Sequence, residues 1–331
     1  MVITSEPHEG NQRISKTGKS PIFGNMRLFR NVTIVTLLAA GPVAPSVRSQ
    51  VHTVEGLRVA IAERVARVSG AQVAVSFRAM DGTESLDLNA EADFHAASTM
   101  KVPVMIEVLR AVDAGRLALD QRILLVNRFH SILDGSPYSL DAGEDSDSSV
   151  YQHLGERVAV RELLERMIVR SSNLATNTLI ALVGAAQADS TAHQLGATHM
   201  RVLRGVEDGK AFAAGMNNTT TSADLASLML HVERADALMP ASAALMKEIL
   251  LRQEFNESIP AGVPAGTPVA HKTGSITAVL HDAAIVYPPG RAPYVLVVLT
   301  RSIPDGKVAE SLIADISRLV WAHAMPTGVT Q

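Results

Sequence analysis

The stretch Tyr294-Val295-Leu296-Val297-Val298-Leu299-Thr300 is an unbroken run of strand-forming residues near the end of the chain. The turn sequence Pro288-Pro289-Gly290-Arg291 precedes it, and the apolar segment 283–287 precedes the turn. Two apolar runs joined by a turn rich in proline and glycine are typical of a tight hairpin. A further strand is predicted at 269–272, so the end of the chain is expected to form an antiparallel meander.

The beginning of the chain predicts two more strands. Apolar residues alternate from Val73 to Phe77, and a second strand through Leu86 and Leu88 follows the turn at Asp81-Gly82. Strands from both chain ends can share one sheet. We therefore predict an α+β fold with an antiparallel five-stranded sheet.

Helical periodicity accounts for most of the remaining sequence. Amphipathic helices are predicted at 54–68 and around 312–320, and these terminal helices would flank the sheet. Further helical patterns occur after Ser98 and at 160–168, 174–183, 190–195, 222–232 and 241–251, whereas 129–150 is predicted to be a long surface loop. The predicted organisation is an N-terminal extension with a signal peptide (1–49), a sheet domain (50–95 plus 255–326) and an inserted all-helical domain (96–254). The cleft between the two domains is the expected site.

Composition excludes several classes of function. The chain has 331 residues, 47% of them apolar, a net charge of −3 and no cysteine. The absence of a basic block excludes nucleic acid as the expected partner, and the absence of cysteine excludes disulfides, thiolate zinc sites and cysteine nucleophiles. The 11 histidines form no close ligand pair, so we expect neither a metal nor a cofactor. A small-molecule substrate and a monomeric protein are the expectation.

The N-terminal region contains a secretory signal pattern. A basic segment, 26–30, precedes the short apolar run 32–40, and Val47-Arg48-Ser49 offers a cleavage site. The run is too short to cross a bilayer, so no stable membrane span is expected after cleavage. This pattern predicts export to the periplasm and a translation start at Met26, with a disordered tail as the alternative interpretation.

Ser98 and Lys101 form a candidate nucleophile and base in Ala96-Ala97-Ser98-Thr99-Met100-Lys101-Val102-Pro103-Val104. If a helix begins at Ser98, the spacing of three residues places the lysine amine one turn above the hydroxyl. The positive end of the helix dipole would also favour the neutral amine. Alone, S-x-x-K is a weak motif.

Two further motifs strengthen it: Ser171-Ser172-Asn173 between two helices, and Lys272-Thr273-Gly274 on a strand. Their order and spacing resemble those of the active-site serine β-lactamases and penicillin-binding proteins. The wider sequence, about residues 53 to 324, is similar to class A β-lactamases, including Thr219-Thr220-Thr221 before a helix. This resemblance implies the β-lactamase/transpeptidase-like fold and a serine hydrolase.

The resemblance also implies roles for individual residues. Ser98 would attack the β-lactam carbonyl, Lys101 would accept its proton, and Ser171 would relay a proton to the departing nitrogen. Asn173 would hold the side-chain amide of the substrate. The carboxylate of the substrate would bind to three residues, Lys272, Thr273 and Ser275. The backbone N–H groups of Ser98 and Ser275 would form the oxyanion hole.

The sequence departs from the class A pattern in two places. Ser172 stands where class A enzymes have aspartate, and the loop motif E-x-x-L-N is absent. Glu207, within Arg204-Gly205-Val206-Glu207-Asp208-Gly209-Lys210, is the nearest candidate for the base that activates the deacylating water. Asn177 is expected to orient it. The alternative interpretation is a solvated glutamate paired with Lys210.

Three functions follow from these motifs. The first is a secreted class A-like β-lactamase that works through an acyl-enzyme on Ser98. The second is a penicillin-binding D,D-peptidase-like enzyme, or an esterase of the same fold, with slow β-lactam deacylation. The third is a non-catalytic protein that binds cell-wall ligands. The loop around Glu207 separates the first two, and acyl-adduct formation separates both from the third.

Overall fold

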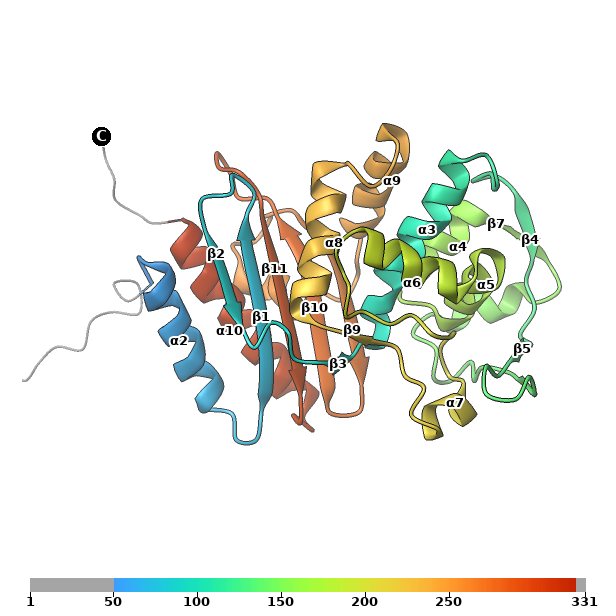
Figure 1. Cartoon of the computed structure of the whole chain (residues 1–331), viewed down its shortest axis with the longest axis horizontal. Helices are drawn as coiled ribbons and strands as arrows, with labels where there is room; N and C mark the ends of the chain where they lie inside the picture. Colours follow the sequence, from blue (N-terminus) through green and yellow to red (C-terminus); the bar gives the residue numbers. More distant parts are fainter. Residues whose placement is uncertain (1–50, 326–331) are drawn as a thin grey trace, which may run out of the picture. The chain divides into compact units, whose positions relative to one another are not determined.

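A five-stranded antiparallel sheet is the central element of the structure, a computed structural model that describes residues 51–325. Its order is β2-β1-β11-β10-β9, so the two N-terminal strands lie beside the three C-terminal ones (Figure 1). The bounds are β1 Gln72–Ala79, β2 Ser85–Leu88, β9 Val269–Ile276, β10 Val279–Val286 and β11 Tyr294–Arg301. The predicted sheet, built from both ends of the chain, is thereby confirmed.

Strand β11 lies in the middle of this sheet. It pairs with β1 from Gln72↔Arg301 to Ala79↔Tyr294, and with β10 on its other edge. Leu296 and Val298 belong to one hydrophobic core, while their neighbours Val295 and Val297 belong to the other. Because both faces of the strand are covered, its sequence is continuously apolar instead of alternating.

The two terminal helices cover one face of the sheet (Figure 1). They are α2 Val54–Ala66 and α10 Gly306–Ala324, which pack against each other and against the sheet. Leu312, Ile316 and Val320 of α10 are fully buried, as their helical spacing predicts. Helix α8 (Ser222–Arg234) contacts β1 and β11 from the opposite face, together with the rest of the middle segment.

The middle of the chain contains the other helices and also several short strands. The helices are α3 Lys101–Asp113, α4 Val160–Val169, α5 Asn173–Val183, α6 Ala185–Gln194, α7 Gly209–Ala213 and α9 Pro240–Leu250. Two-residue and three-residue ladders pair β3 (Phe94–His95) with β8 (Thr219–Thr220), β4 (Arg122–Leu124) with β7 (Arg157–Ala159) and β5 (Phe129–His130) with β6 (Pro137–Tyr138). The prediction of a wholly helical segment was therefore wrong in detail, because strands this short leave no periodic pattern. The domain boundaries remain a prediction.

The segment 129–150 is mostly exposed, as predicted for a surface loop, but it contains short regular elements that the sequence did not predict. It includes the β5–β6 ladder and leads into a 3₁₀ helix, Ser148–His153. Asp145 and Asp147 within it are only 6% and 1% exposed. Most other residues of the segment are exposed, so buried hydrogen bonding is confined to a few side chains. The predicted signal sequence lies outside the described residues, and within 51–325 no helix has the length and apolar character needed to cross a bilayer.

Candidate active site

The three motifs come together in the folded chain. Ser98 lies in the 3₁₀ helix Ala97–Met100 that leads into α3, Ser171 lies between α4 and α5, and Lys272 lies on β9. Ser98 lines two cavities. One, of about 260 Å³, is also lined by Ser171, Asn173, Thr273 and Ser275. The other, of about 390 Å³, includes Asn173, Glu207 and Ser275.

Close backbone packing fixes the position of Ser98. The preceding residue, Ala97, has φ 46°, a left-handed conformation that costs energy for any residue with a Cβ. Its backbone N–H donates to His95 Nδ1 at 3.0 Å. On the other side, a Cβ on Gly274 would lie 2.9 Å from the Ser98 nitrogen and 3.0 Å from the Thr99 nitrogen. Glycine is therefore required for β9 to approach the nucleophile so closely.

Lys101 is the first residue of α3, and its side chain is fully buried. The ammonium donates to Ser171 O at 2.6 Å, Ser171 Oγ at 3.1 Å and Asn173 Oδ1 at 2.9 Å. Burial lowers the pKa of Lys101 to about 7, against the opposing effect of the Asp145 and Glu207 carboxylates. A neutral amine is thus available near neutral pH.

Two details of the predicted base differ from expectation. The main cause of the lowered pKa is burial of the Lys101 side chain, whereas the sequence suggested the helix dipole. In addition, no hydrogen bond joins Ser98 Oγ to Lys101 Nζ in the described part of the chain, because the amine is directed to Ser171 and Asn173. Catalytic hydrogen bonds often shorten only when substrate binds, so this geometry keeps Lys101 as a candidate base.

Ser171 lies between two buried lysines. Its Oγ is 3.1 Å from Lys101 Nζ and 3.0 Å from Lys272 Nζ, and its backbone has φ 58°. Lys272 also donates to Thr273 O at 2.8 Å. Because both ammonium groups occupy the lone pairs of Ser171 Oγ, the hydroxyl proton is left to point elsewhere. Burial and the nearby Lys101 cation lower the pKa of Lys272, and Asp282 raises it.

Glu207 faces the same centre from the loop before α7. Its Oε1 accepts a hydrogen bond of 2.7 Å from Asn173 Nδ2, and its backbone has φ 60°. Asn177 was expected to orient this carboxylate, and it makes no hydrogen bond to the carboxylate itself. Instead it clamps the preceding residue, donating to Val206 O at 3.0 Å and accepting from Val206 N at 2.7 Å. Asn177 therefore positions Glu207 through the backbone.

The neighbours of Glu207 are engaged in other contacts. Lys210 pairs with Asp134 at 2.7 Å, so the expected alternative of a Glu207–Lys210 pair is not formed. Asp208 accepts from Ser131 Oγ at 2.8 Å, Ile132 N at 2.9 Å and Ala211 N at 3.1 Å. Its carboxylate therefore stabilises the loop and caps α7. Glu207 is left as the carboxylate of this loop that faces the site.

Two residues that shape the site were missed in the sequence. A Cβ on Gly205 would lie 2.5 Å from Asn177 Oδ1, so glycine permits the clamp on the Glu207 loop. Asp145 Oδ2 accepts from Asn173 N at 2.9 Å and from Leu174 N at 2.9 Å. Both contacts join segments that are far apart in the sequence, so no local sequence pattern predicts them. Within residues 51–325 no cluster of His, Asp or Glu has the arrangement needed to hold a metal.

Comparison with known proteins agrees with this geometry. The model of the Beta-lactamase enzyme family matches residues 56–324. A β-lactamase of Amycolatopsis lactamdurans is 30% identical over 241 residues, which are 71% of this chain and 75% of the relative. The extended-spectrum β-lactamase PER-1 of Pseudomonas aeruginosa is 27% identical, over 76% of this chain and 82% of its own.

Solved structures give the same result. A β-lactamase from Sphaerobacter thermophilus superposes with TM-score 0.71 at 29% identity, covering 83% of this chain and 99% of its own. PBP-A superposes with TM-score 0.68 at 30% identity, covering 80% and 94%. The motifs, the fold and the matched length point the same way, and the chain is a member of the class A serine β-lactamase family.

Proposed function

We propose that the protein hydrolyses β-lactams through an acyl-enzyme on Ser98. One observation carries this proposal: Ser171 Oγ lies 3.1 Å from Lys101 Nζ and 3.0 Å from Lys272 Nζ, beside a cavity that Ser98 also lines. A hydroxyl that accepts from two lysines next to a candidate nucleophile can relay a proton from a lysine to the substrate. Its own O–H is directed away from both amines, and the reacting nitrogen can receive that proton.

The net result of acylation is that one proton moves from Ser98 to the departing nitrogen. Ser98 Oγ bonds to the lactam carbonyl carbon, and the C–N bond breaks. The Ser98 proton passes to the neutral amine of Lys101, and Ser171 gives its proton to the departing nitrogen while regaining one from Lys101. The backbone N–H groups of Ser98 and Ser275 would stabilise the oxyanion, each by about 3 kcal/mol.

Substrate binding uses groups around the two cavities. Thr273 and Ser275 line the smaller cavity and can hydrogen-bond the substrate carboxylate, while Lys272 supplies positive charge from behind Ser171. Asn173 already accepts from Lys101 and donates to Glu207. An amide has two acceptor sites and two donor protons, so one of each remains for the side-chain amide of the substrate.

Deacylation needs a base for water, and Glu207 is the proposed one. It is exposed, lines the larger cavity with Ser98, and is held by Asn173. A carboxylate there can take a proton from a water that attacks the acyl ester, and it returns that proton to Ser98 as the ester bond breaks. This second step distinguishes a β-lactamase from an enzyme that is only acylated.

The deciding experiment is intact-protein mass spectrometry after mixing with benzylpenicillin. We expect a stoichiometric adduct that decays within the time of steady-state turnover. A long-lived adduct would favour the penicillin-binding alternative, for which the likeness to PBP-A is the supporting observation; a point mutant of PBP-A has been solved as an acyl-enzyme complex with penicillin G. Complete absence of an adduct would favour a non-catalytic binding protein.

Cellular location and assembly are part of the same proposal. The basic and apolar segments before residue 50 support export to the periplasm, where β-lactams reach their targets. We propose that the exported protein acts as a monomer, because every proposed catalytic group comes from this one chain. Size-exclusion chromatography with light scattering would test the second point.

A further inference from the structure

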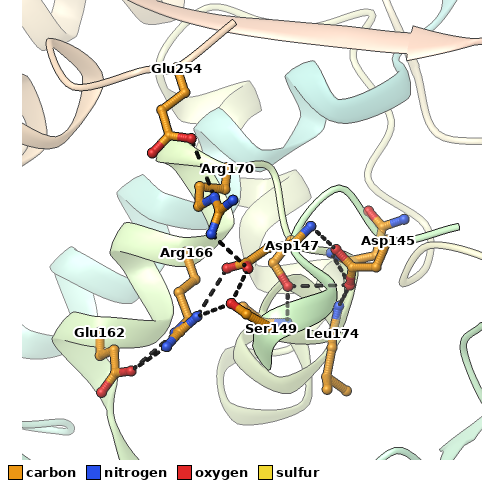
Figure 2. A network of polar contacts seen from close by, with 11 residues as sticks. Asp145, Asp147, Ser149, Glu162, Arg166, Arg170, Leu174 and Glu254 are labelled. Atoms are coloured by element: carbon orange, nitrogen blue, oxygen red, sulfur yellow. Dashed lines mark hydrogen bonds and ion pairs between the residues drawn. The ribbon is translucent and has the colours of Figure 1, made fainter. Parts of the chain in front are cut away.

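Asp145 is a buried carboxylate whose contacts converge on the start of α5. It lies in the segment between β6 and the 3₁₀ helix Ser148–His153 and is 6% exposed. Oδ2 accepts from the backbone N–H groups of Asn173 and Leu174, both at 2.9 Å, and from Ser172 Oγ at 3.3 Å. Figure 2 shows the carboxylate directed at this helix end. It therefore caps α5 from a distant part of the chain.

The helix end that Asp145 caps also holds the centre of the active site. Asn173, the first residue of α5, binds Lys101 through Oδ1 and Glu207 through Nδ2. Ser171, two residues earlier, receives hydrogen bonds from Lys101 and Lys272. A small rotation of this helix end would move both contacts together. Its cap thus bears directly on the geometry of the two lysines.

The segment that carries Asp145 is itself anchored to α4. Asp147, 1% exposed, pairs with Arg166 at 3.1 Å and with Arg170 at 3.3 Å. Arg166 also pairs with Glu162, and Arg170 with Glu254, as Figure 2 shows. The backbone N–H of Asp147 donates to Asp145 Oδ1 at 2.9 Å. The two aspartates thus have separate roles: Asp147 anchors the segment to α4, and Asp145 caps the start of α5 beside the active site.

We propose that Asp145 is a positioning residue for acylation: it supplies, from a separate segment, the carboxylate that the Ser171-Ser172-Asn173 motif lacks at its middle position. Ser172 Oγ, which stands where class A enzymes have aspartate, donates to Asp145 and accepts from Ala175 N at 3.2 Å. With serine at position 172, the negative charge beside the start of α5 comes from Asp145, and the Ser172 hydroxyl completes the cap. This inference rests on the proposed function of Ser171, Asn173 and Lys101.

The charge of Asp145 also acts on Lys101. The charged groups facing that amine are the Asp145 and Glu207 carboxylates, which raise its pKa, and Lys272, the neighbouring cation. Asp282 raises the pKa of Lys272 and is no cause of the Lys101 shift. An anion stabilises the protonated amine, so neutralising Asp145 should lower the pKa of Lys101. The neutral base would then persist to lower pH.

The test compares Asp145→Asn with Asp147→Asn in the full mature protein. Acylation by benzylpenicillin is followed in single turnover between pH 5 and 9, and unfolding is followed by circular dichroism. Asparagine keeps one acceptor oxygen, so Asp145→Asn should slow acylation by roughly tenfold. The acidic limb of the pH–rate profile, where acylation slows as Lys101 becomes protonated, should move down by about one pH unit. Asp147→Asn should lower Tm and leave the limb in place, because arginines neutralise that carboxylate.

A compensating variant separates positioning from simple damage to the fold. Asp145→Asn combined with Ser172→Asp returns a carboxylate to the same helix end from the motif itself. We expect this double variant to recover at least half of the lost acylation rate on a logarithmic scale and to restore the acidic limb. If Asp145→Asn alone fails to fold, the double variant is compared directly with the wild type, and a folded double variant without the wild-type acidic limb overturns the inference.

Three results would overturn the inference. They are an unshifted acidic limb in Asp145→Asn, an equal shift in Asp147→Asn, or a folded double variant that regains stability without regaining the limb. Failure of the proposed function is a different observation, because the wild-type protein would then form no penicillin adduct at all. Normal wild-type acylation with an insensitive Asp145→Asn rejects the positioning role alone.

Discussion

Two fully buried lysines that both donate to one serine hydroxyl set the chemistry of the site at the scale of single residues. Burial lowers the pKa of both, and two cations so close also oppose each other. A bound substrate carboxylate would favour the charged form of Lys272. The same event leaves Lys101 as the amine that can give up its proton. The substrate thus helps to assign the two lysines to different tasks.

Acylation should depend on pH through Lys101. Its pKa of about 7 means that the neutral amine predominates above pH 7 and is lost below it. We therefore expect kcat/KM for acylation to rise about tenfold for each pH unit below this value and to level off above it. Stopped-flow acylation across pH 5 to 9 measures the limb. A rate independent of pH over that range would contradict the assignment of the base.

Replacing the nucleophile should abolish acylation without unfolding the protein. Ser98→Ala removes the attacking oxygen, and alanine is a mild change in a short helix. Lys101→Ala should also lose most of the acylation, although it leaves a cavity. Mass spectrometry detects the adduct and circular dichroism measures Tm. Stoichiometric labelling of the Ser98→Ala protein would show that another residue is the nucleophile.

Glu207→Gln should separate acylation from deacylation. The amide cannot take a proton from water, so the variant should label with penicillin and accumulate the acyl-enzyme. Turnover should fall by at least about a hundredfold, the size typical of general-base catalysis. Adduct lifetime by mass spectrometry is the measurement.

Lys210→Ala is the matched control for the same loop. It removes an exposed ion pair with Asp134 and should leave adduct lifetime unchanged. Unchanged turnover in Glu207→Gln would place the base elsewhere, with Lys101 the next candidate, because the carboxylate of Asp208 is used in loop contacts.

The sequence predicted that Ser98, Ser171 and Lys272 share one site, because the order and spacing of their three motifs resemble those of the active-site serine β-lactamases. Asp145 and Gly205 could not be found in this way. Each acts on a residue about thirty positions away, Asp145 on Asn173 and Gly205 on Asn177. Contacts of this kind depend on how loops return to the site, which local periodicity does not encode.

At the scale of elements, the approach of β9 to the 3₁₀ helix Ala97–Met100 decides whether the site can form. The strands and most helices were predictable from periodicity, but some ends were not: α6 begins at Ala185 instead of 190, and β10 begins at Val279 instead of 283. The 3₁₀ geometry at Ser98 was not, because it depends on the positive φ of Ala97 and on a strand from the other end of the chain. The strand and the helix meet without an intervening side chain at Gly274.

Gly274→Ala should therefore damage acylation more than stability. The added Cβ would lie 2.9 Å from the Ser98 nitrogen, a contact that must push the nucleophile and β9 apart. A displacement of this kind can cost about a hundredfold in rate. Acylation kinetics and Tm should be measured together.

Gly306→Ala provides the matched control. That glycine begins α10, has open space around its Cβ position and has no positive φ. Alanine there should leave both rate and Tm nearly unchanged. If Gly274→Ala acylates at the wild-type rate, the close approach is not required for the chemistry.

At the scale of the whole molecule, the sheet is assembled from segments at both ends of the chain while the middle contributes Ser98, Ser171 and Glu207. The sequence predicted this arrangement from two early strands, three late ones and the helical periodicity between them. It did not predict the short ladders of the middle segment, because pairs of two or three residues carry too little pattern.

The mature protein should begin between residues 45 and 52. A basic segment, an apolar run and small residues follow one another in the order that a signal peptidase recognises. N-terminal sequencing of protein recovered from the periplasm would locate the cut. An exported chain that retains residues 26–40 would contradict the proposed signal.

The pairing of β1 with β11 has a consequence for synthesis. Ala79 faces Tyr294 across the sheet, so about 215 residues must be made before the edge of the first hairpin meets its partner. At typical translation speeds this takes roughly ten to forty seconds. During that interval one edge of the eight-residue strand β1 keeps unpaired backbone groups that other nascent chains can contact. We therefore expect the newly made polypeptide to need a holding chaperone or, on the proposed export route, prompt transfer across the membrane, so its yield should fall when that transfer is slowed.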